Sequence, residues 1–412
     1  MDFQKYDDIF NKDNYPMFQK TFLPVSEKVC ICLSGKQYSN CCKNDVDEAF
    51  KNRKYLNESV EEELQQRYFK KDKKLLSHIV ENKSINKKNI AYCSAHKVFG
   101  DCSNNMTRSH TLSRGNILKN LSFSKNVIRF NDHKIPEHSA LLQEILDYYT
   151  EVSIDDASAT VSFCKKHDEE LFADIEKHGY TDYSGSDIQN VEYSLKAISF
   201  DIYYKVMNIR YMAQLIEESK FVVCHPDGSI SDYFRNYNYL VDTLFRLYPL
   251  MLKLLMELKQ LKAQTIAIPE LKTVYFELPA RIINFSLSEI FDIDDTICYI
   301  NVINSKKPFI IVSYYKEYGR IEEIDKLKKQ FESYIKTNMN NQLMCLWHFI
   351  KHELLINAQN IYFNKSAFYR LSNEAQIYLF CVHREGLTHI PSDVQQKYDS
   401  EIQRILYVLY DI

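Results

Sequence analysis

Cysteine and histidine residues that could bind a metal gather in two parts of this 412-residue chain. The first group is Cys30, Cys32, Cys41 and Cys42, a C-x-C pair and a C-C pair with eight residues between them. Four thiolates at about 2.3 Å suit one tetrahedral Zn²⁺ ion, which has no competing geometric preference. A segment this short cannot build its own core, so we expect the metal to supply its folding free energy.

The second group consists of Cys93, Cys102, Cys164 and His167. Cys164-x-x-His167 has the spacing of one half of a zinc site. Cys102 would complete the other half with Cys93, although Cys93-x-x-His96 is a rival pairing. Two separated halves, with a hairpin between them and a helix after the second, would make a treble-clef finger. The helix is expected from residue 167 onward, where acids come early and a histidine comes late.

Two residues near this second group could carry out acid–base chemistry. His110 supplies a pKa near 7, which a general base needs, and Asp168 directly follows His167. The sequence leaves open a second interpretation, in which His110 is a zinc ligand or a buried, hydrogen-bonded histidine. Basic residues flank the region and would either contact phosphates or be solvated; they are Arg108, Arg114, Lys119, Lys125 and Arg129.

The stretch from Cys30 to Cys42 closely resembles the SEC-C motif, a small zinc module at the end of the SecA translocation ATPase and on many unrelated proteins. The family pattern is C-x-C-x-S-G-x-x-Y followed by C-C or C-H, and this chain keeps the four cysteines with Ser34, Gly35, Lys36 and Tyr38. Ile31 and Leu33 depart from the usual Pro and Gly, which changes loop shape more than metal binding. The resemblance implies a module that docks a protein partner.

The order Cys…Cys…His…Cys-x-x-His-Asp over residues 93–168 is similar to the HNH endonucleases. By this resemblance the second group holds a structural zinc, and His110 takes the place of the base that activates water. Such a site also holds a catalytic Mg²⁺ or Mn²⁺, for which Asp168, Asn116 and His133 are the candidates. The chain departs from the family at Ser109, where HNH enzymes often carry an acid.

Composition excludes several classes of protein. The chain has 8 glycines and 9 prolines, which weighs against a β-sandwich, a Rossmann phosphate loop or a P-loop. A net charge of −3 excludes a uniformly basic nucleic-acid coat, so any nucleic acid must bind to a local patch. No segment approaches the ~18 uninterrupted apolar residues of a membrane span, and the N-terminus lacks a secretory signal. We therefore expect a cytoplasmic protein without a membrane partner.

The pattern of apolar residues predicts a multidomain, helix-rich α+β protein. We expect five consecutive segments: a zinc module (1–44), a charged helix and linker (45–89), a treble-clef zinc region (90–185), a helical hairpin (186–265) and a C-terminal domain in which an antiparallel sheet packs with helices (266–412). One long helix is expected over 187–219. A strand is expected at 126–135.

The second helix of the expected hairpin carries a heptad seam of apolar residues. Its members are Leu240, Leu244, Leu247, Met251, Leu254, Leu258 and Leu261. The seam would either pack inside the chain or form a homodimer through residues 228–263. After Pro269 the period changes, and residues 272–279, 281–287, 296–304 and 307–315 are rich in Ile, Val, Tyr and Phe, which favours four strands. Helices are expected at 319–337, 341–356, 366–384 and from Pro391 onward.

Two functions fit these observations. The first is a zinc protein that acts on nucleic acid, an HNH-like nuclease of the kind found among bacterial phage-defence or toxin effectors. The second is a non-enzymatic adaptor in which both zinc ions are structural and the SEC-C module docks a partner. The His110–Asp168 pair favours the nuclease, and the near-neutral net charge favours the adaptor.

Overall fold

The structure is a computed structural model of the whole chain. It describes residues 17–18, 21–22, 36–40, 92–103, 105–130, 148–176, 183–219, 232–278, 282–293, 296–316, 329, 347–356, 358–386 and 390–408. Short pieces precede residue 92: strands β1 (Met17–Phe18) and β2 (Thr21–Phe22) pair with each other, and a 3₁₀ turn covers Tyr38–Asn40. The charged segment expected at 45–89 lies outside the described residues.

The chain forms two compact units, each assembled from segments that are separated in sequence. The first draws on the described residues up to Ser109, on Thr160–Glu170 and on Asp201–Lys259. The second draws on His110–Ala159, Leu171–Phe200 and the described residues from Gln260 onward. The five consecutive segments expected from the sequence stay a prediction.

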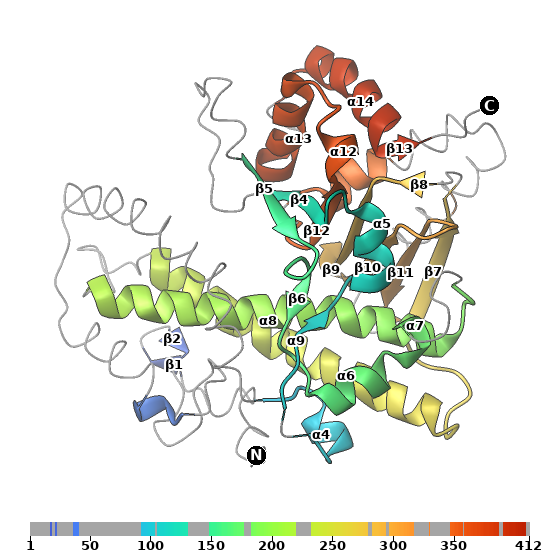
Figure 1. Cartoon of the computed structure of the whole chain (residues 1–412). Coiled ribbons are helices and arrows are strands. Elements are labelled where there is room, and N and C mark those ends of the chain that lie inside the picture. Colours follow the sequence, from blue (N-terminus) through green and yellow to red (C-terminus); the bar gives the residue numbers. More distant parts are fainter. Residues whose placement is uncertain are drawn as a thin grey trace. The chain divides into compact units, whose positions relative to one another are not determined.

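A seven-stranded antiparallel sheet forms the centre of the second unit (Figure 1). In spatial order its strands are β5 (Tyr149–Ser153), β4 (Asn126–Phe130), β12 (Ile361–Asn364), β9 (Phe285–Ile293), β10 (Thr296–Ile303), β11 (Phe309–Tyr314) and β7 (Lys272–Glu277). The strands expected at 272–279, 296–304 and 307–315 and the strand near residue 126 are therefore confirmed. The strand expected at 281–287 has other bounds, because it is divided at Asn284 and β9 continues to Ile293. A further short strand, β8 (Ile282–Ile283), pairs with β13 (Tyr407–Val408) outside this sheet.

The membership of the sheet differs from the expectation in one respect. We expected a sheet built from residues 266–412, but β4 and β5 join it from residues 126–153. The link is β12, which pairs with β9 on one side and with β4 on the other, setting Phe363 opposite both Phe285 and Ile128. Local patterns in sequence cannot show this pairing, because it joins strands more than 200 residues apart.

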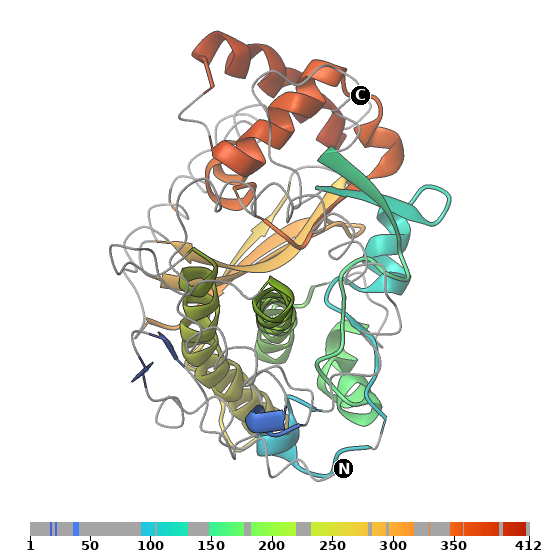
Figure 2. The same cartoon turned by 90° about the vertical axis from the view of Figure 1, so that its left-hand side faces the viewer.

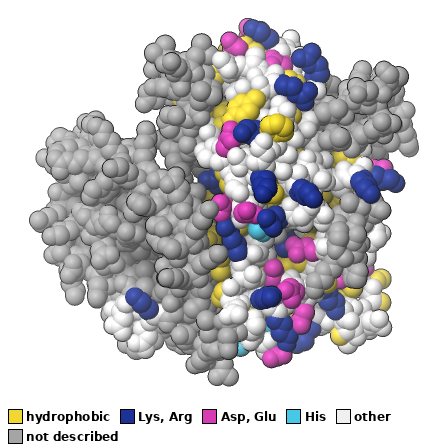
Figure 3. Space-filling view, in the orientation of Figure 1, with side chains coloured by type: hydrophobic (Ala, Val, Ile, Leu, Met, Phe, Trp, Pro, Cys, Tyr) yellow, Lys and Arg dark blue, Asp and Glu magenta, His cyan; other side chains and the backbone are white. Residues whose placement is uncertain are grey.

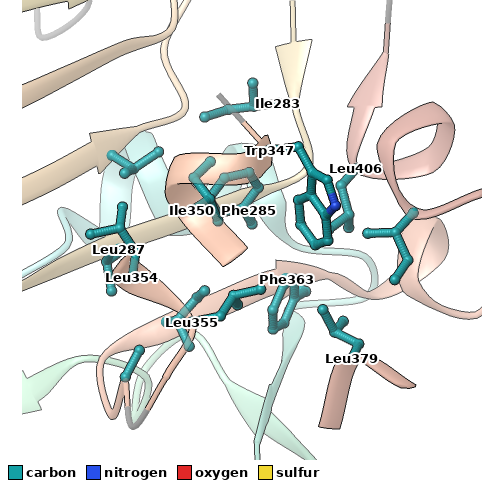
Figure 4. Packing of buried hydrophobic residues seen from close by; sticks show 14 of the residues in the cluster. Ile283, Phe285, Leu287, Trp347, Ile350, Leu354, Leu355, Phe363, Leu379 and Leu406 are labelled. Carbon is teal, nitrogen blue, oxygen red and sulfur yellow. The ribbon is translucent and has the colours of Figure 1, made fainter. Parts of the chain in front are cut away.

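One face of the sheet packs against the C-terminal helices, as two views show (Figures 1 and 2). These helices are α12 (Lys365–Phe368), α13 (Asn373–Glu385) and α14 (Ser392–Leu406), with a π-helix at Ile350–Leu354. Figure 4 shows Trp347 among Phe285, Leu379 and Leu406. The expected helices 366–384 and 391 onward are confirmed in outline, 341–356 is described only from residue 347, and 319–337 is outside the described residues apart from residue 329.

A carboxylate joins three side chains beside this core. Asp399 of α14 accepts hydrogen bonds from Trp347 Nε1 at 2.9 Å and from the Tyr378 hydroxyl at 2.8 Å. Its other oxygen accepts from Lys351 Nζ at 2.8 Å. Since Trp347, Lys351 and Tyr378 are all buried, this one carboxylate satisfies three donors that water does not reach freely.

The opposite face of the sheet is covered by residues that follow His110. A π-helix (Arg114–Leu118) and α5 (Lys119–Leu121) bury Leu112, Leu118 and Leu121 against Ile311 and Tyr362. Polar side chains are buried here as well. Asn360 Nδ2 donates to Thr111 Oγ1 at 2.8 Å, and the Tyr362 hydroxyl accepts from the Ser158 backbone N–H at 2.6 Å.

Two long helices follow one another in the sequence, as the expected hairpin requires. They are α8 (Asp187–Ser219), with the expected bounds, and α9 (Asp232–Lys262), which continues through Pro249. The heptad seam of α9 is buried within the single chain at Leu240, Leu244, Leu247, Met251, Leu254 and Leu258, and half-buried at Leu261. The homodimer contact through residues 228–263 stays a prediction.

Candidate metal centre

Two segments of the first unit bring the second ligand group together. Cys93 precedes the short helix α4 (His96–Phe99), and Cys102 follows it. The chain reverses between them at Gly100 and Asp101, whose φ angles are +63° and +36°. Glycine adopts such positive angles without strain, which explains its place in the turn. The turn returns Cys102 to the side of Cys93.

The second segment supplies Cys164 and His167 at the start of α6 (Lys165–Leu171). Backbone hydrogen bonds hold this segment against the first: Ser94 N–H donates to the Ser162 carbonyl at 2.9 Å, Thr107 N–H to the Phe163 carbonyl at 3.0 Å, and Lys165 N–H to the Asn105 carbonyl at 2.9 Å. Helix α7 (Ala173–Glu176) follows α6, so the expected helix is present as two short pieces.

The four expected ligands form one group. A sulfur or nitrogen atom from each of Cys93, Cys102, Cys164 and His167 lies within 4.8 Å of the others. His167 Nδ1 lies 3.4 Å from the sulfur of Cys93, 3.5 Å from that of Cys102 and 3.3 Å from that of Cys164. Metal–sulfur and metal–nitrogen bonds of ordinary zinc length, set at the tetrahedral angle, place such atoms about 3.6 Å apart. The spacing therefore fits Zn²⁺ held through Nδ1.

The thiols of the group have strongly different proton affinities. Burial raises the pKa of Cys93 well above its ordinary value. A hydrogen bond from the Cys93 thiol lowers the pKa of Cys164 to about 4. The Cys164 backbone N–H also donates to Cys93 Sγ, at 3.3 Å. Because a thiolate is the form that binds metal, Cys164 is prepared for Zn²⁺ before the metal arrives, whereas Cys93 must release a proton when the metal binds.

Residues around the group decide between the rival ligands. The group of four contains Cys102, and His96 lies beside it with Nδ1 3.6 Å from Cys102 Sγ. His96 is therefore a neighbour of Cys102 and lies outside the group of four. The Phe99 ring packs on His167 with 5.7 Å between centroids, and Lys259 Nζ lies 5.6 Å from the Phe99 ring. Sequence spacing did not single out Phe99 or Lys259.

The predicted catalytic residues have other partners. The Asp168 carboxylate accepts a hydrogen bond from Ser109 Oγ, the residue noted as a departure from the HNH pattern. The backbone carbonyl of His110 accepts from Lys196 Nζ at 2.8 Å, and His110 Nε2 is buried. The catalytic roles of His110 and Asp168 stay predictions.

A second metal site is not visible in the described part of the chain. There, three or more His, Cys, Asp or Glu side chains gather in a metal-binding arrangement only at the group of four. Of the candidates for a catalytic ion, Asn116 lies in the π-helix Arg114–Leu118, and His133 is outside the described residues. Cys30, Cys32, Cys41 and Cys42 are also outside them, so the SEC-C zinc stays a prediction.

Lys196 is a buried charge that the sequence did not reveal, since it lies within the long helix α8. Its side chain is 1% exposed, and Nζ donates to Glu176 Oε1 at 2.7 Å. The same ammonium group lies 3.9 Å from the centre of the Phe172 ring. Lys196 thus joins the backbone of the His110 segment to α7 and to an aromatic side chain.

No protein-family model, curated protein or solved structure matches the chain. Among the described residues, no helix is long and apolar enough to cross a membrane. The metal centre and its surroundings are therefore the features that indicate a function.

Proposed function

We propose that Cys93, Cys102, Cys164 and His167 bind a structural Zn²⁺ ion. Structural zinc sites are closed by four protein ligands, whereas catalytic sites keep one position open for water or substrate. Three of the four residues are buried and Cys102 is half-buried, so the set supplies a full tetrahedron and little access for substrate. The ion would fasten the segment that carries Cys93 and Cys102 to the start of α6.

Metal content tests this assignment directly. Elemental analysis of protein purified without added metal should give two zinc ions per chain if the SEC-C cluster also binds one. Cys164→Ser should lose one of them, because a hydroxyl group is a poor zinc ligand at neutral pH. Cys381→Ser is the matched control, since Cys381 lies in α13 outside the ligand set, and it should keep both. An unchanged zinc content in Cys164→Ser would refute the proposed site.

For the whole chain, we infer that the function best supported is that of a zinc-stabilised adaptor. The observation that carries it is the closed ligand set. Surface charge agrees: on the face in Figure 3, the described Lys and Arg side chains are interspersed with Asp and Glu, whereas proteins that bind nucleic acid concentrate basic side chains. The SEC-C module would dock the protein partner of this adaptor.

An HNH-like nuclease is the second candidate, and one contact favours it. Ser109 Oγ donates a hydrogen bond to the carboxylate of Asp168. Asp168 follows the proposed ligand His167 in the sequence, and the proposed base His110 follows Ser109. Asp168 is thus adjacent in sequence to a zinc ligand, and His110 is adjacent to the residue that bonds Asp168. Mg²⁺ or Mn²⁺ would supply the charge that stabilises the leaving group.

One experiment separates the two functions. Zinc-loaded protein is incubated with plasmid DNA or RNA in the presence of Mg²⁺ or Mn²⁺, and His110→Ala is assayed beside it. Cutting that is lost in His110→Ala at an unchanged zinc content would establish the nuclease, because removal of a base costs roughly 10²–10⁴ in rate and leaves the zinc ligands intact. Intact nucleic acid with the wild-type protein is the result expected for the adaptor.

A further inference from the structure

A hollow of about 660 Å³ lies within the second unit, away from the metal ligands in sequence. One wall is formed by the turn that precedes α8, including Tyr183 and Asp187. The other is formed by the edge strand β7, on which Thr273, Tyr275 and Glu277 share one face and Lys272 lies at the start of the strand. A hollow of this size admits a small organic molecule or the end of a long side chain.

The aromatic part of the hollow is held in place by its neighbours. The rings of Tyr183 and Tyr275 stack with 4.7 Å between centroids and 18° between planes. Tyr183 also stacks on the buried ring of Phe309 at 5.2 Å, and its hydroxyl donates to Asn190 Oδ1. Tyr275 remains 38% exposed. A ligand would therefore meet rings that need no rearrangement, which reduces the entropic cost of binding.

The charges of the hollow favour a cation. Two acidic residues, Asp187 and Glu277, line it, and Lys272 is the one basic residue of the lining. Burial raises the pKa of Tyr183 to about 12, and the negative charge of Asp187 adds to the rise. Burial likewise raises the pKa of Tyr275, with Glu277 adding to it. The carboxylates thus act on both rings. Because Tyr183 is stacked between Tyr275 and Phe309, the exposed ring of Tyr275 is the one that a cation can contact.

We propose that this hollow binds an organic cation, an alkylated ammonium group, which contacts the exposed ring of Tyr275 and is neutralised by Glu277 and Asp187. Aromatic side chains with nearby carboxylates bind such groups because the cation keeps favourable electrostatics after it loses water. The group would belong to a small molecule or to a methylated lysine of a peptide. The proposal is independent of zinc and of any nuclease activity.

The test uses choline and its uncharged analogue dimethylbutanol, in which carbon replaces the charged nitrogen. Binding to the full-length protein is followed by saturation-transfer NMR of the ligand. Choline should bind saturably and more tightly than dimethylbutanol. Tyr275→Leu should weaken choline binding by roughly fivefold or more, from the size of cation–π interactions. Tyr239→Leu is the matched control, because Tyr239 is an exposed tyrosine of α9, and it should leave binding unchanged.

Two charge variants fix the sign of the interaction, and neither alters the core. Glu277→Gln should weaken choline binding, and Lys272→Gln should strengthen it. If Tyr275→Leu does not fold, the two charge variants alone test the proposal. Three results would overturn the proposal: absence of saturable choline binding, equal binding of choline and dimethylbutanol, or the reverse order of the two charge variants, which would indicate an anion.

The source of the cation is identified by a second pair of probes. A short peptide with one trimethyllysine is compared with the same peptide carrying unmodified lysine. Preference for the trimethylated peptide over choline would identify a peptide partner, whereas tighter binding of choline would identify a small molecule. Either result supports the cation site. If neither probe binds, the proposal is overturned.

Discussion

Replacement of Glu192 with glutamine should remove a large part of the pH dependence of folding stability. Glu192 lies in α8 with a fully buried side chain. One carboxylate oxygen accepts the Ile175 backbone N–H at 3.1 Å, and the other pairs with Lys262 Nζ at 2.8 Å. Burial raises the pKa of Glu192 from 4.5 to about 8. It outweighs the attraction of Lys262, whose ammonium group also lies 3.5 Å from Asp174.

The sign of the effect follows from proton binding in the two states. Between about pH 4.5 and pH 8, the folded protein holds the Glu192 proton and the unfolded chain releases it. The free energy of unfolding therefore falls as pH rises through this window. One pKa unit corresponds to about 1.4 kcal/mol, so the fall between about pH 5.5 and 7.5 amounts to about 2–3 kcal/mol. A typical domain has a total stability of only about 5–15 kcal/mol.

Urea unfolding of the wild type and Glu192→Gln at these two pH values measures the effect. Acid also protonates zinc ligands, but this happens in both proteins and cancels when their unfolding free energies are subtracted. The difference should shift by about 2–3 kcal/mol in favour of the variant at the higher pH. Glu277→Gln is the control, because Glu277 is exposed, and it should follow the wild type. Parallel behaviour of Glu192→Gln and wild type would refute the reasoning and show that Lys262 keeps the carboxylate ionised.

Three other substitutions test features of the two units. Lys196→Met removes the ammonium group that donates to Glu176, and should lower the free energy of unfolding by about 1–3 kcal/mol in urea titrations; equal stability would contradict this. Asp399→Ala leaves three buried donors without their acceptor, and should cost about 2–4 kcal/mol and shift the fluorescence of the single tryptophan; an unchanged spectrum would count against it. Joint replacement of Cys41 and Cys42 with serine should release one zinc and barely move the thermal transition of the remaining chain, since metal-coupled folding is local; a large fall would show a module packed into the core.

The parts of the fold that sequence predicted are those with a strong local period. Helix α8, of 33 residues, has its expected bounds because an apolar stripe extends along it from Val191 to Ala213. The seam of α9 is buried as expected, and the strands from Lys272 to Tyr314 are where β-branched and aromatic residues cluster. The partners of β4 and β5 could not be predicted, because pairing through β12 is set by three-dimensional packing and not by any pattern along the chain.

The sequence predicted the residues of the candidate site but left one ligand undecided. The C-x-x-H spacing located Cys164 and His167, and chemistry then limited the partners to Cys93 with Cys102 or His96. The choice between Cys102 and His96 needed the three-dimensional structure, because the turn at Gly100 returns Cys102 to the group. The burial of Lys196 had no signal at all, because a lysine on a long helix is normally solvated.

The position of β12 has a consequence for how this protein is made. The hairpin of β4 and β5 is complete once Ser153 has left the ribosome, but its partner strand ends at Asn364. Translation of the residues between them takes about 10–40 s at ordinary rates of 5–20 residues per second. During that interval the inner edge of β4 has no strand to pair with, and unpaired strand edges recruit other chains. Nascent chains are therefore exposed to aggregation until β12 is synthesised, and a chain truncated before Ile361 would keep that edge open permanently.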